Sequence, residues 1–290
     1  QIEWISHARQ PEEAALLTQL QESLNVIAGH GRQGQLIATH LMKAASSSQF
    51  ALEQQLNRMQ HLRNQITHGL EEFLNDSDRD TNLWSDDIES NPTPNLYQQT
   101  LLKFGDRIAA LIETLEAVST DSKLDSLISL LNRLGLFSSS DRRVCIFTSY
   151  IATATFLEST LSEHHSHVAS VTGSLSYTER EQAVSNFGQN GGILIATPAM
   201  SMWIPEVAAV IFYDLPMNPA TLDAGIGEYI RIGRSGPAHI CAFTDESEIL
   251  LIEQLQKTIE IEKALGSDEA LKLPFPDDHT KMNGSQECSE

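Results

Sequence analysis

The chain has 290 residues, 41% of them hydrophobic, and a formal net charge of −20. This composition suits a soluble globular protein with one large or two modest domains, and we expect no membrane span, because no apolar run approaches roughly 18 residues. The three cysteines have neither metal-ligand spacing nor a disulfide pattern. They predict a reducing compartment, cytoplasmic or, in a eukaryote, nuclear, and argue against secretion.

The first part of the chain predicts helices. Residues 11–28 place apolar side chains three and four positions apart, and Pro11 suits a first helical turn. Further helices are predicted over residues 36–44, 50–74, 97–118 and 122–134. Asp121 or Ser122 is the expected N-cap of the last one. We therefore expect a helical region over 1–75 and a second group of helices over 96–136.

Acidic residues are concentrated in two segments. Residues 71–90 hold eight acids and one base, and residues 245–290 hold twelve acids and four lysines. Such segments are more often solvated spacers than binding surfaces. We expect an acidic flexible linker over 76–95 and a disordered polar tail over 267–290. The rest of the chain shows no basic stripe, so DNA binding by the chain alone is expected to be weak.

Strands and helices alternate from residue 143 onward. Strands are predicted over residues 144–150, 167–173, 191–197, 207–215 and 239–245, and helices over 151–164, 177–189 and 247–265. Short apolar strands joined by helices predict right-handed crossovers and a parallel sheet with helices on both faces. The fold class is therefore α/β over 143–266, preceded by an all-helical region.

One run of residues carries the motifs from Val207 to Arg234: VAAVIFYDLPMNPATLDAGIGEYIRIGR. It contains a predicted strand, then the residues DLP and NP, and then a turn with arginines. This order resembles the last motifs of the C-terminal RecA-like lobe of superfamily-two helicases, most closely the Snf-type and RapA-type DNA translocases. Those proteins follow DLP-x-NP with Q-R-x-G-R-x-x-R-x-G. The resemblance implies a P-loop NTPase-like, RecA-like sheet and, as the family activity, ATP hydrolysis coupled to DNA translocation.

Motifs upstream of this run occur in the order that the resemblance requires. Residues 147–150, FTSY, are similar to a strand-end motif, and residues 173–180 match G-x-x-S-x-x-E-R. The resemblance implies nucleic-acid backbone contacts from Thr148, Ser149, Gly173 and Thr197. Ligands approach an open parallel sheet at its strand C-termini, which suits Thr197. Ser176 and Glu179 have a simpler explanation as a capping box that starts a helix.

Other positions depart from the family pattern. Trp203 and Pro205 stand where the family has a glycine and an Asp or Asn of the nucleotide pocket. A tryptophan side chain keeps a ligand from coming as close to the backbone as it can at a glycine, and proline offers no side-chain hydrogen-bond acceptor. In an ungapped alignment Ala224 replaces the motif's glutamine. Glu228 replaces its first catalytic arginine and puts a negative charge where phosphoryl transfer needs a positive one.

Two arginines remain as candidates for nucleotide binding. The resemblance implies that Arg231 is a remnant arginine finger. Arg234 is a second candidate contact to the nucleotide, but its place next to Gly233 and before Ser-Gly-Pro also suits an ordinary turn residue. The chain has no G-x-x-x-x-G-K-[ST] loop. We therefore expect no cofactor for the chain alone, and ATP with Mg²⁺ only if a first RecA-like lobe is paired with it. His164, His165 and His167 lack a further ligand, so no metal site is predicted.

The functional hypothesis is a pseudo-helicase lobe that is catalytically degenerate and acts as a structural or regulatory subunit. Its expected partner is another protein or a first helicase lobe, and no membrane is expected. One alternative is a fragment of an active ATP-dependent DNA translocase whose first lobe lies upstream or on another chain. The other is a helical protein–protein docking module built on residues 11–134.

Overall fold

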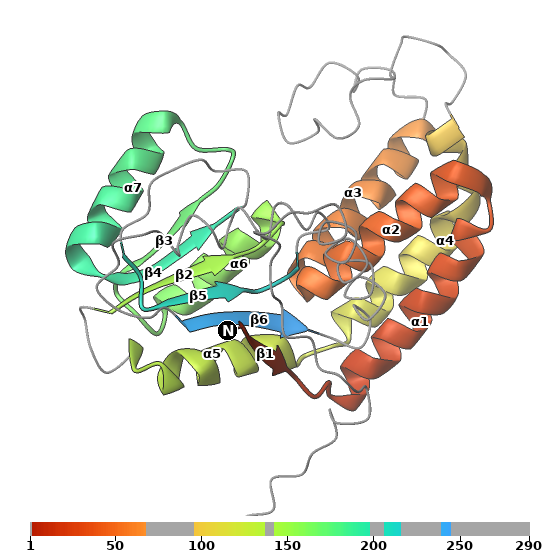
Figure 1. Ribbon diagram of the computed structural model, residues 1–290. Coiled ribbons are helices and arrows are strands. Elements are labelled where there is room, and N and C mark those ends of the chain that lie inside the picture. The colour runs from red at the N-terminus through yellow and green to blue at the C-terminus, as the bar shows by residue number, and fades with distance from the viewer. Residues whose placement is uncertain (1, 68–95, 137–141, 198–205, 216–238, 245–290) are drawn as a thin grey trace, which may run out of the picture.

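The computed structural model describes residues 2–67, 96–136, 142–197, 206–215 and 239–244. Within these ranges the chain forms an α/β lobe with a bundle of long helices beside it (Figure 1). None of the helices in the described ranges is long and apolar enough to cross a membrane.

The α/β lobe is built on a six-stranded sheet in which all neighbouring strands are parallel. Its strands are β1 (Ile2–Ser6), β2 (Arg143–Phe147), β3 (Val168–Val171), β4 (Gly192–Ala196), β5 (Ala209–Phe212) and β6 (His239–Thr244). They lie in the order β1-β6-β5-β2-β4-β3. The prediction of a parallel α/β sheet is confirmed.

Strand β1 is the part of the lobe that the sequence did not predict. It pairs in parallel with β6, with Ile2 opposite Ile240 and Ser6 opposite Thr244. The region predicted as all-helical over residues 1–75 therefore begins with a strand of the sheet. The correction changes the architecture, because the helical bundle is inserted between the first strand of the lobe and the rest of it.

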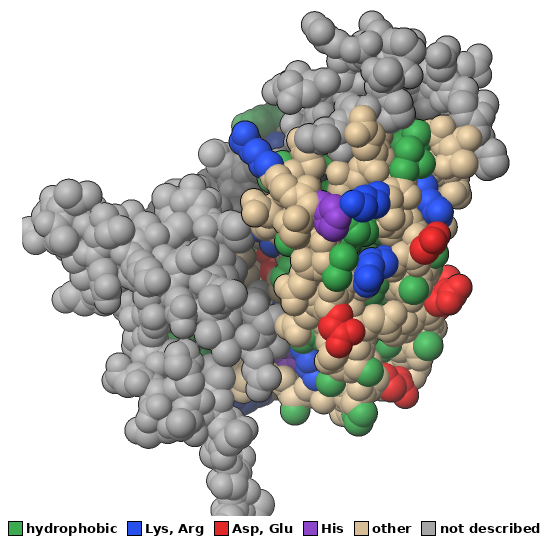
Figure 2. All heavy atoms as spheres, turned by 90° about the vertical axis from the view of Figure 1, so that its right-hand side faces the viewer, with side chains coloured by type: hydrophobic (Ala, Val, Ile, Leu, Met, Phe, Trp, Pro, Cys, Tyr) green, Lys and Arg blue, Asp and Glu red, His purple; other side chains and the backbone are tan. Residues whose placement is uncertain are grey.

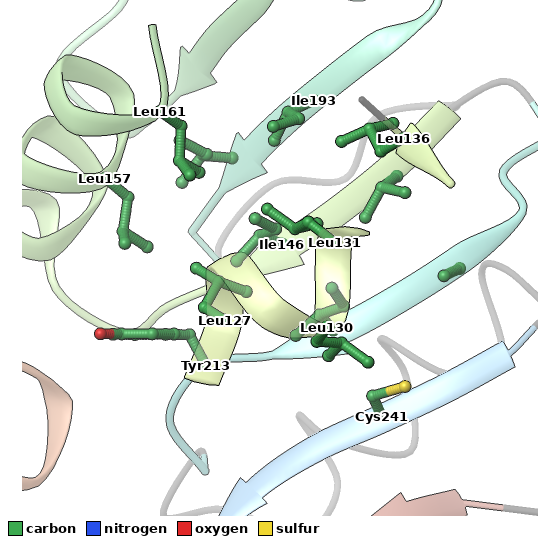
Figure 3. Close-up of a cluster of buried hydrophobic side chains, with 14 of the residues drawn as sticks. Leu127, Leu130, Leu131, Leu136, Ile146, Leu157, Leu161, Ile193, Tyr213 and Cys241 are labelled. Atoms are coloured by element: carbon green, nitrogen blue, oxygen red, sulfur yellow. The ribbon is translucent and has the colours of Figure 1, made fainter. Parts of the chain in front are cut away.

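Helices cover both faces of the sheet, as predicted. Helices α5 (Ser122–Arg133) and α6 (Ile151–Ser162) pack on one face, and α7 (Tyr177–Asn190) packs on the other. Figure 3 shows the first of these layers, in which leucines of α5 and α6 meet Ile146, Ile193 and the ring of Tyr213. The apolar strands, buried on both sides, account for the nearly continuous hydrophobic runs in this half of the sequence.

The helical bundle has its own core. It consists of α1 (Pro11–Ala28), α2 (Gly31–Ser47), α3 (Gln49–Thr67) and α4 (Leu96–Glu116). Apolar side chains such as Leu20, Leu41 and Leu111 are fully buried between the helices. Helices α1 and α2 approach closely at Gly34, where an added Cβ would lie 1.9 Å from the carbonyl oxygen of Ile27.

Most predicted helix bounds agree with the structure. Helix α1 has the bounds that were predicted, and Asp121 caps α5 by accepting a hydrogen bond from the Leu124 amide at 2.9 Å. Helix α2 is longer than predicted, because Gly31, with a φ of 79°, begins the helix directly after α1. The predicted linker (76–95), closing helix (247–265) and tail (267–290) lie outside the described residues.

Candidate functional site

Polar side chains gather where the strands of the sheet end. The carboxyl ends of parallel strands share one edge, which is where ligands bind open α/β sheets. Thr148 and Ser149 follow β2, Thr172 and Gly173 follow β3, Thr197 follows β4, Asp214 lies two residues beyond β5, and Thr244 ends β6. We call these residues the strand-end edge, and it is the candidate functional site.

Asp214 organises the middle of the strand-end edge. Its carboxylate is 4% exposed, and it accepts hydrogen bonds on both oxygens. Oδ2 accepts from the hydroxyls of Thr148 at 2.5 Å and Ser47 at 2.7 Å, and Oδ1 accepts from the backbone amide of Ser149 at 2.8 Å. Three donors satisfy this buried charge, and they tie the ends of β2 and β5 together.

The helical bundle joins the lobe at this same carboxylate. Ser47 and Ser48, at the α2–α3 junction, lie 2.7 and 2.8 Å from the hydroxyl of Thr153 on α6. Ser48 also accepts from the Ala51 amide at 3.0 Å, which caps the start of α3. Since Ser47 bonds Asp214 as well, one buried polar cluster of Ser47, Ser48, Thr148, Thr153 and Asp214 fixes the bundle against the strand-end edge.

The predicted backbone-contact residues differ in accessibility. Thr148 is 1% exposed and its hydroxyl donates to Asp214, so in this arrangement it is not free to bond a phosphate. Thr197 is 6% exposed, whereas the side chain of Ser149 is exposed. Gly173 is exposed too, and no atom lies within 4 Å of where its Cβ would be. Ser149 and Gly173 are therefore the accessible members of the predicted set.

The turn after β3 is held by its own side chains. Arg180 donates from Nε to the carbonyl of Leu175 at 2.8 Å and from Nη2 to the carbonyl of Gly173 at 2.9 Å. Ser176 and Glu179 form the predicted capping box of α7, and these hydrogen bonds from Ser176 lower the pKa of Glu179. The structural explanation of this motif is confirmed, and it fixes the position of Gly173 on the strand-end edge.

A second buried polar cluster lies where the bundle meets the lobe, and the sequence did not reveal it. Lys123 donates to the carbonyl oxygen of Ser46 at 2.5 Å, and its Nζ lies 4.6 Å from the ring centroid of Tyr213. Burial raises the pKa of Tyr213 well above its usual value. Burial, followed by the charges of Lys123 and Arg9, lowers the pKa of His7 to about 3. The one feature of the sequence that could have indicated this cluster is Lys123, a lysine on the apolar face of α5.

The candidate nucleotide-pocket residues lie outside the described residues. These are Trp203, Pro205, Ala224, Glu228, Arg231 and Arg234, whose assignments remain predictions. Within the described ranges, no group of three or more His, Cys, Asp or Glu side chains is arranged to hold a metal ion.

The fold and the strand-end edge define the class of the lobe. Residues 122–236 match the family described as the helicase conserved C-terminal domain, from α5 to beyond β5. Over this part of the chain the parallel sheet has the RecA-like fold of a helicase C-terminal lobe.

The curated relatives of the chain are named as RNA helicases. It is 32% identical over 147 residues to the ATP-dependent RNA helicase DBP3 of Candida albicans, an alignment covering 49% of this chain and 25% of that protein. It is 33% identical over 144 residues to the ATP-dependent RNA helicase DBP8 of Debaryomyces hansenii, covering 48% and 33%. The chain thus spans a third or less of these relatives. The narrower resemblance to Snf-type and RapA-type DNA translocases is not supported by them.

Two solved structures share the fold over most of the chain. The Hef helicase domain of Pyrococcus furiosus aligns with a TM-score of 0.56 and 15% identity, covering 85% of this chain and 55% of that one. The C-terminal part of the Fun30 ATPase domain aligns with a TM-score of 0.50 and 15% identity, covering 88% of each chain. Both alignments extend well beyond the matched helicase domain, so the likeness in fold is not confined to residues 122–236.

Proposed function

We propose that the chain is the second lobe of an ATP-dependent RNA helicase-like protein and binds the RNA backbone along its strand-end edge. The observation that carries the proposal is the edge itself, a row of hydroxyl and backbone groups at the carboxyl ends of β2, β3 and β4 in a helicase C-terminal lobe. The names of the curated relatives favour RNA over DNA.

The chemistry of the edge fits a backbone ligand. Ser149 and Gly173 present a hydroxyl and a backbone segment to solvent, and such groups bind phosphate and sugar without reading bases. The one carboxylate at the centre of the edge, Asp214, is buried and fully hydrogen-bonded, so its charge is offset by three donors. We expect affinity to be modest and to depend on salt.

ATP chemistry enters the proposal only through a first RecA-like lobe, which would supply the phosphate-binding loop and Mg²⁺. Glu228 favours the degenerate, regulatory form of the lobe when the motif is aligned without a gap. If the motif instead begins six residues later, Arg234 occupies the first catalytic arginine position, which favours an active form, while Pro237 replaces the last arginine. In both forms we expect no ATP hydrolysis by the isolated chain, because its sequence has no G-x-x-x-x-G-K-[ST] loop.

Fluorescence anisotropy with a labelled single-stranded RNA of about 12 nucleotides tests the proposal. The purified chain should bind this RNA at about 50 mM salt and release it as salt rises. Gly173→Asp should weaken binding about fourfold, as expected for a like charge about 5 Å from a phosphate in water. Gly173→Asn, similar in shape but neutral, is the matched control and should bind like the wild type. No RNA binding at low salt would overturn the proposal.

A further inference from the structure

Helix α2 differs in charge from the rest of the chain. The whole chain contains 39 acidic residues, yet residues 23–52 contain none. Among the helices that the structure describes, α2 is the one without an acidic residue, and it carries Arg32 and Lys43. Two bases do not form a basic stripe, but on this helix no acidic residue offsets them.

The two bases of α2 lie on one side of the helix. Arg32 and Lys43 are 11 residues apart, which is close to three full turns and about 16 Å along the axis. Leu36 and Thr39, on the same side between them, are exposed. We call Arg32, Leu36, Thr39 and Lys43 the α2 row.

The α2 row leads to the strand-end edge. Ser47, one turn beyond Lys43 on the same side of α2, lies 3.4 Å from the Thr148 hydroxyl and bonds Asp214. One turn in the other direction, the carbonyl oxygen of His40 accepts from the Tyr150 hydroxyl at 3.5 Å. The Lys43 end of the α2 row therefore lies about one helical turn from residues that contact the end of β2, where Ser149 is exposed.

No described residue forms an ion pair with the bases of the α2 row. Within the described ranges neither Arg32 nor Lys43 forms an ion pair, whereas Arg63 pairs with Asp106 and Arg133 pairs with Glu3. Partial burial lowers the pKa of Lys43, and an approaching phosphate would oppose that effect. Figure 2 shows the outer face of the bundle, where basic side chains lie mainly toward the upper end and acidic ones mainly toward the lower end.

We propose that the α2 row binds the phosphate backbone of the RNA that lies on the strand-end edge. The inserted bundle then supplies the cations that the edge lacks, because the exposed members of the edge are neutral. A length of about 16 Å covers about five phosphates of one strand in a stacked helix, enough for Arg32 and Lys43 to meet separate phosphates. This inference rests on the proposed function and names the part of the insertion that takes part in it.

The test compares two double variants that remove the same charge. Arg32→Ala with Lys43→Ala changes the α2 row, and Lys103→Ala with Arg107→Ala changes α4, which packs mainly on α3 and less on α1 and α2. With the RNA used above, the α2 variant should bind about tenfold more weakly. Its plot of log affinity against log salt should also be less steep by about 1.4 to 1.8, the share of two phosphate contacts.

The controls separate the possible outcomes. The α4 variant should bind within about twofold of the wild type, and Lys43→Arg, which keeps the charge, should retain the salt dependence. Equal losses in the α2 and α4 variants would overturn the inference, because only net charge would then matter. If the wild type binds RNA and Gly173→Asp weakens it while the α2 variant does not, this inference fails and the proposed function stands. If the wild type binds no RNA, the proposed function fails first.

Discussion

Asp214 holds the inserted bundle and two strand ends together, so removing its carboxylate should destabilise the whole chain. Asp214→Ala leaves the Ser47 and Thr148 hydroxyls and the Ser149 amide without this acceptor. The Ser47 hydroxyl can turn to Thr153, which lies 2.7 Å away, and thereby recover one bond. Hydrogen bonds to a charged group contribute about 1.5 to 3 kcal/mol each, so after the relief of burying a charge we expect a loss of about 3 kcal/mol.

Asp214→Asn should cost much less. The Asn oxygen can keep the bond from the Ser149 amide, while its NH2 group faces hydroxyls that can rotate to accept. We expect a loss of about 1 kcal/mol, the difference between charged and neutral hydrogen bonds. Glu22→Ala, an exposed site on α1, is the control for removing a charge and should stay within about 0.5 kcal/mol.

Urea unfolding followed by circular dichroism measures these differences. With an m-value of about 2 kcal/mol per molar, the Ala variant should unfold at a midpoint about 1.5 M lower than the wild type. A loss under about 1 kcal/mol for Asp214→Ala, or equal losses for Ala and Asn, would refute the account of this cluster.

Three further predictions concern stability. Gly34→Ala should cost about 1 to 3 kcal/mol in urea unfolding, because its Cβ would lie 1.9 Å from the Ile27 carbonyl oxygen; Gly173→Ala, with open space around it, should not. Folding lowers the pKa of His7 from 6.5 to about 3, so between these pH values the unfolded chain binds a proton that the folded chain does not. The free energy of unfolding should therefore be highest above pH 6.5 and fall as pH drops toward 3. The loss should reach up to about 2 kcal/mol at pH 5, and an unchanged pH profile in His7→Gln would contradict this origin. Ser176→Ala should lower the free energy of unfolding by about 1 kcal/mol, because it removes the N-cap of α7. An unchanged free energy of unfolding would show that the capping box does not stabilise the chain.

The parts of the fold that depend on local sequence could be predicted. Helix α1 follows from apolar residues spaced three and four positions apart, and the start of α7 follows from the capping box of Ser176 and Glu179. The strands from β2 to β6 follow from apolar runs that alternate with helices.

The parts that depend on distant partners could not be predicted. Strand β1 is only five residues long, and its pairing with β6 joins segments more than 230 positions apart. Likewise, the sequence around the serines of the α2–α3 junction does not indicate their partner, because Asp214 lies 167 residues from Ser47. The same cluster explains why Thr148, the expected backbone contact, is buried beneath the insertion.

Amide hydrogen exchange on the chain with and without the single-stranded RNA shows most directly where the RNA lies on the protein. RNA should slow exchange at the backbone after β2 and β3, around Ser149 and Gly173, and along the exposed side of α2. Helix α4, which has no place in the proposed path of the RNA, should exchange at the same rate in both samples. Protection that misses the strand-end edge, or no protection at RNA concentrations that saturate binding, would mean that RNA does not lie on this edge.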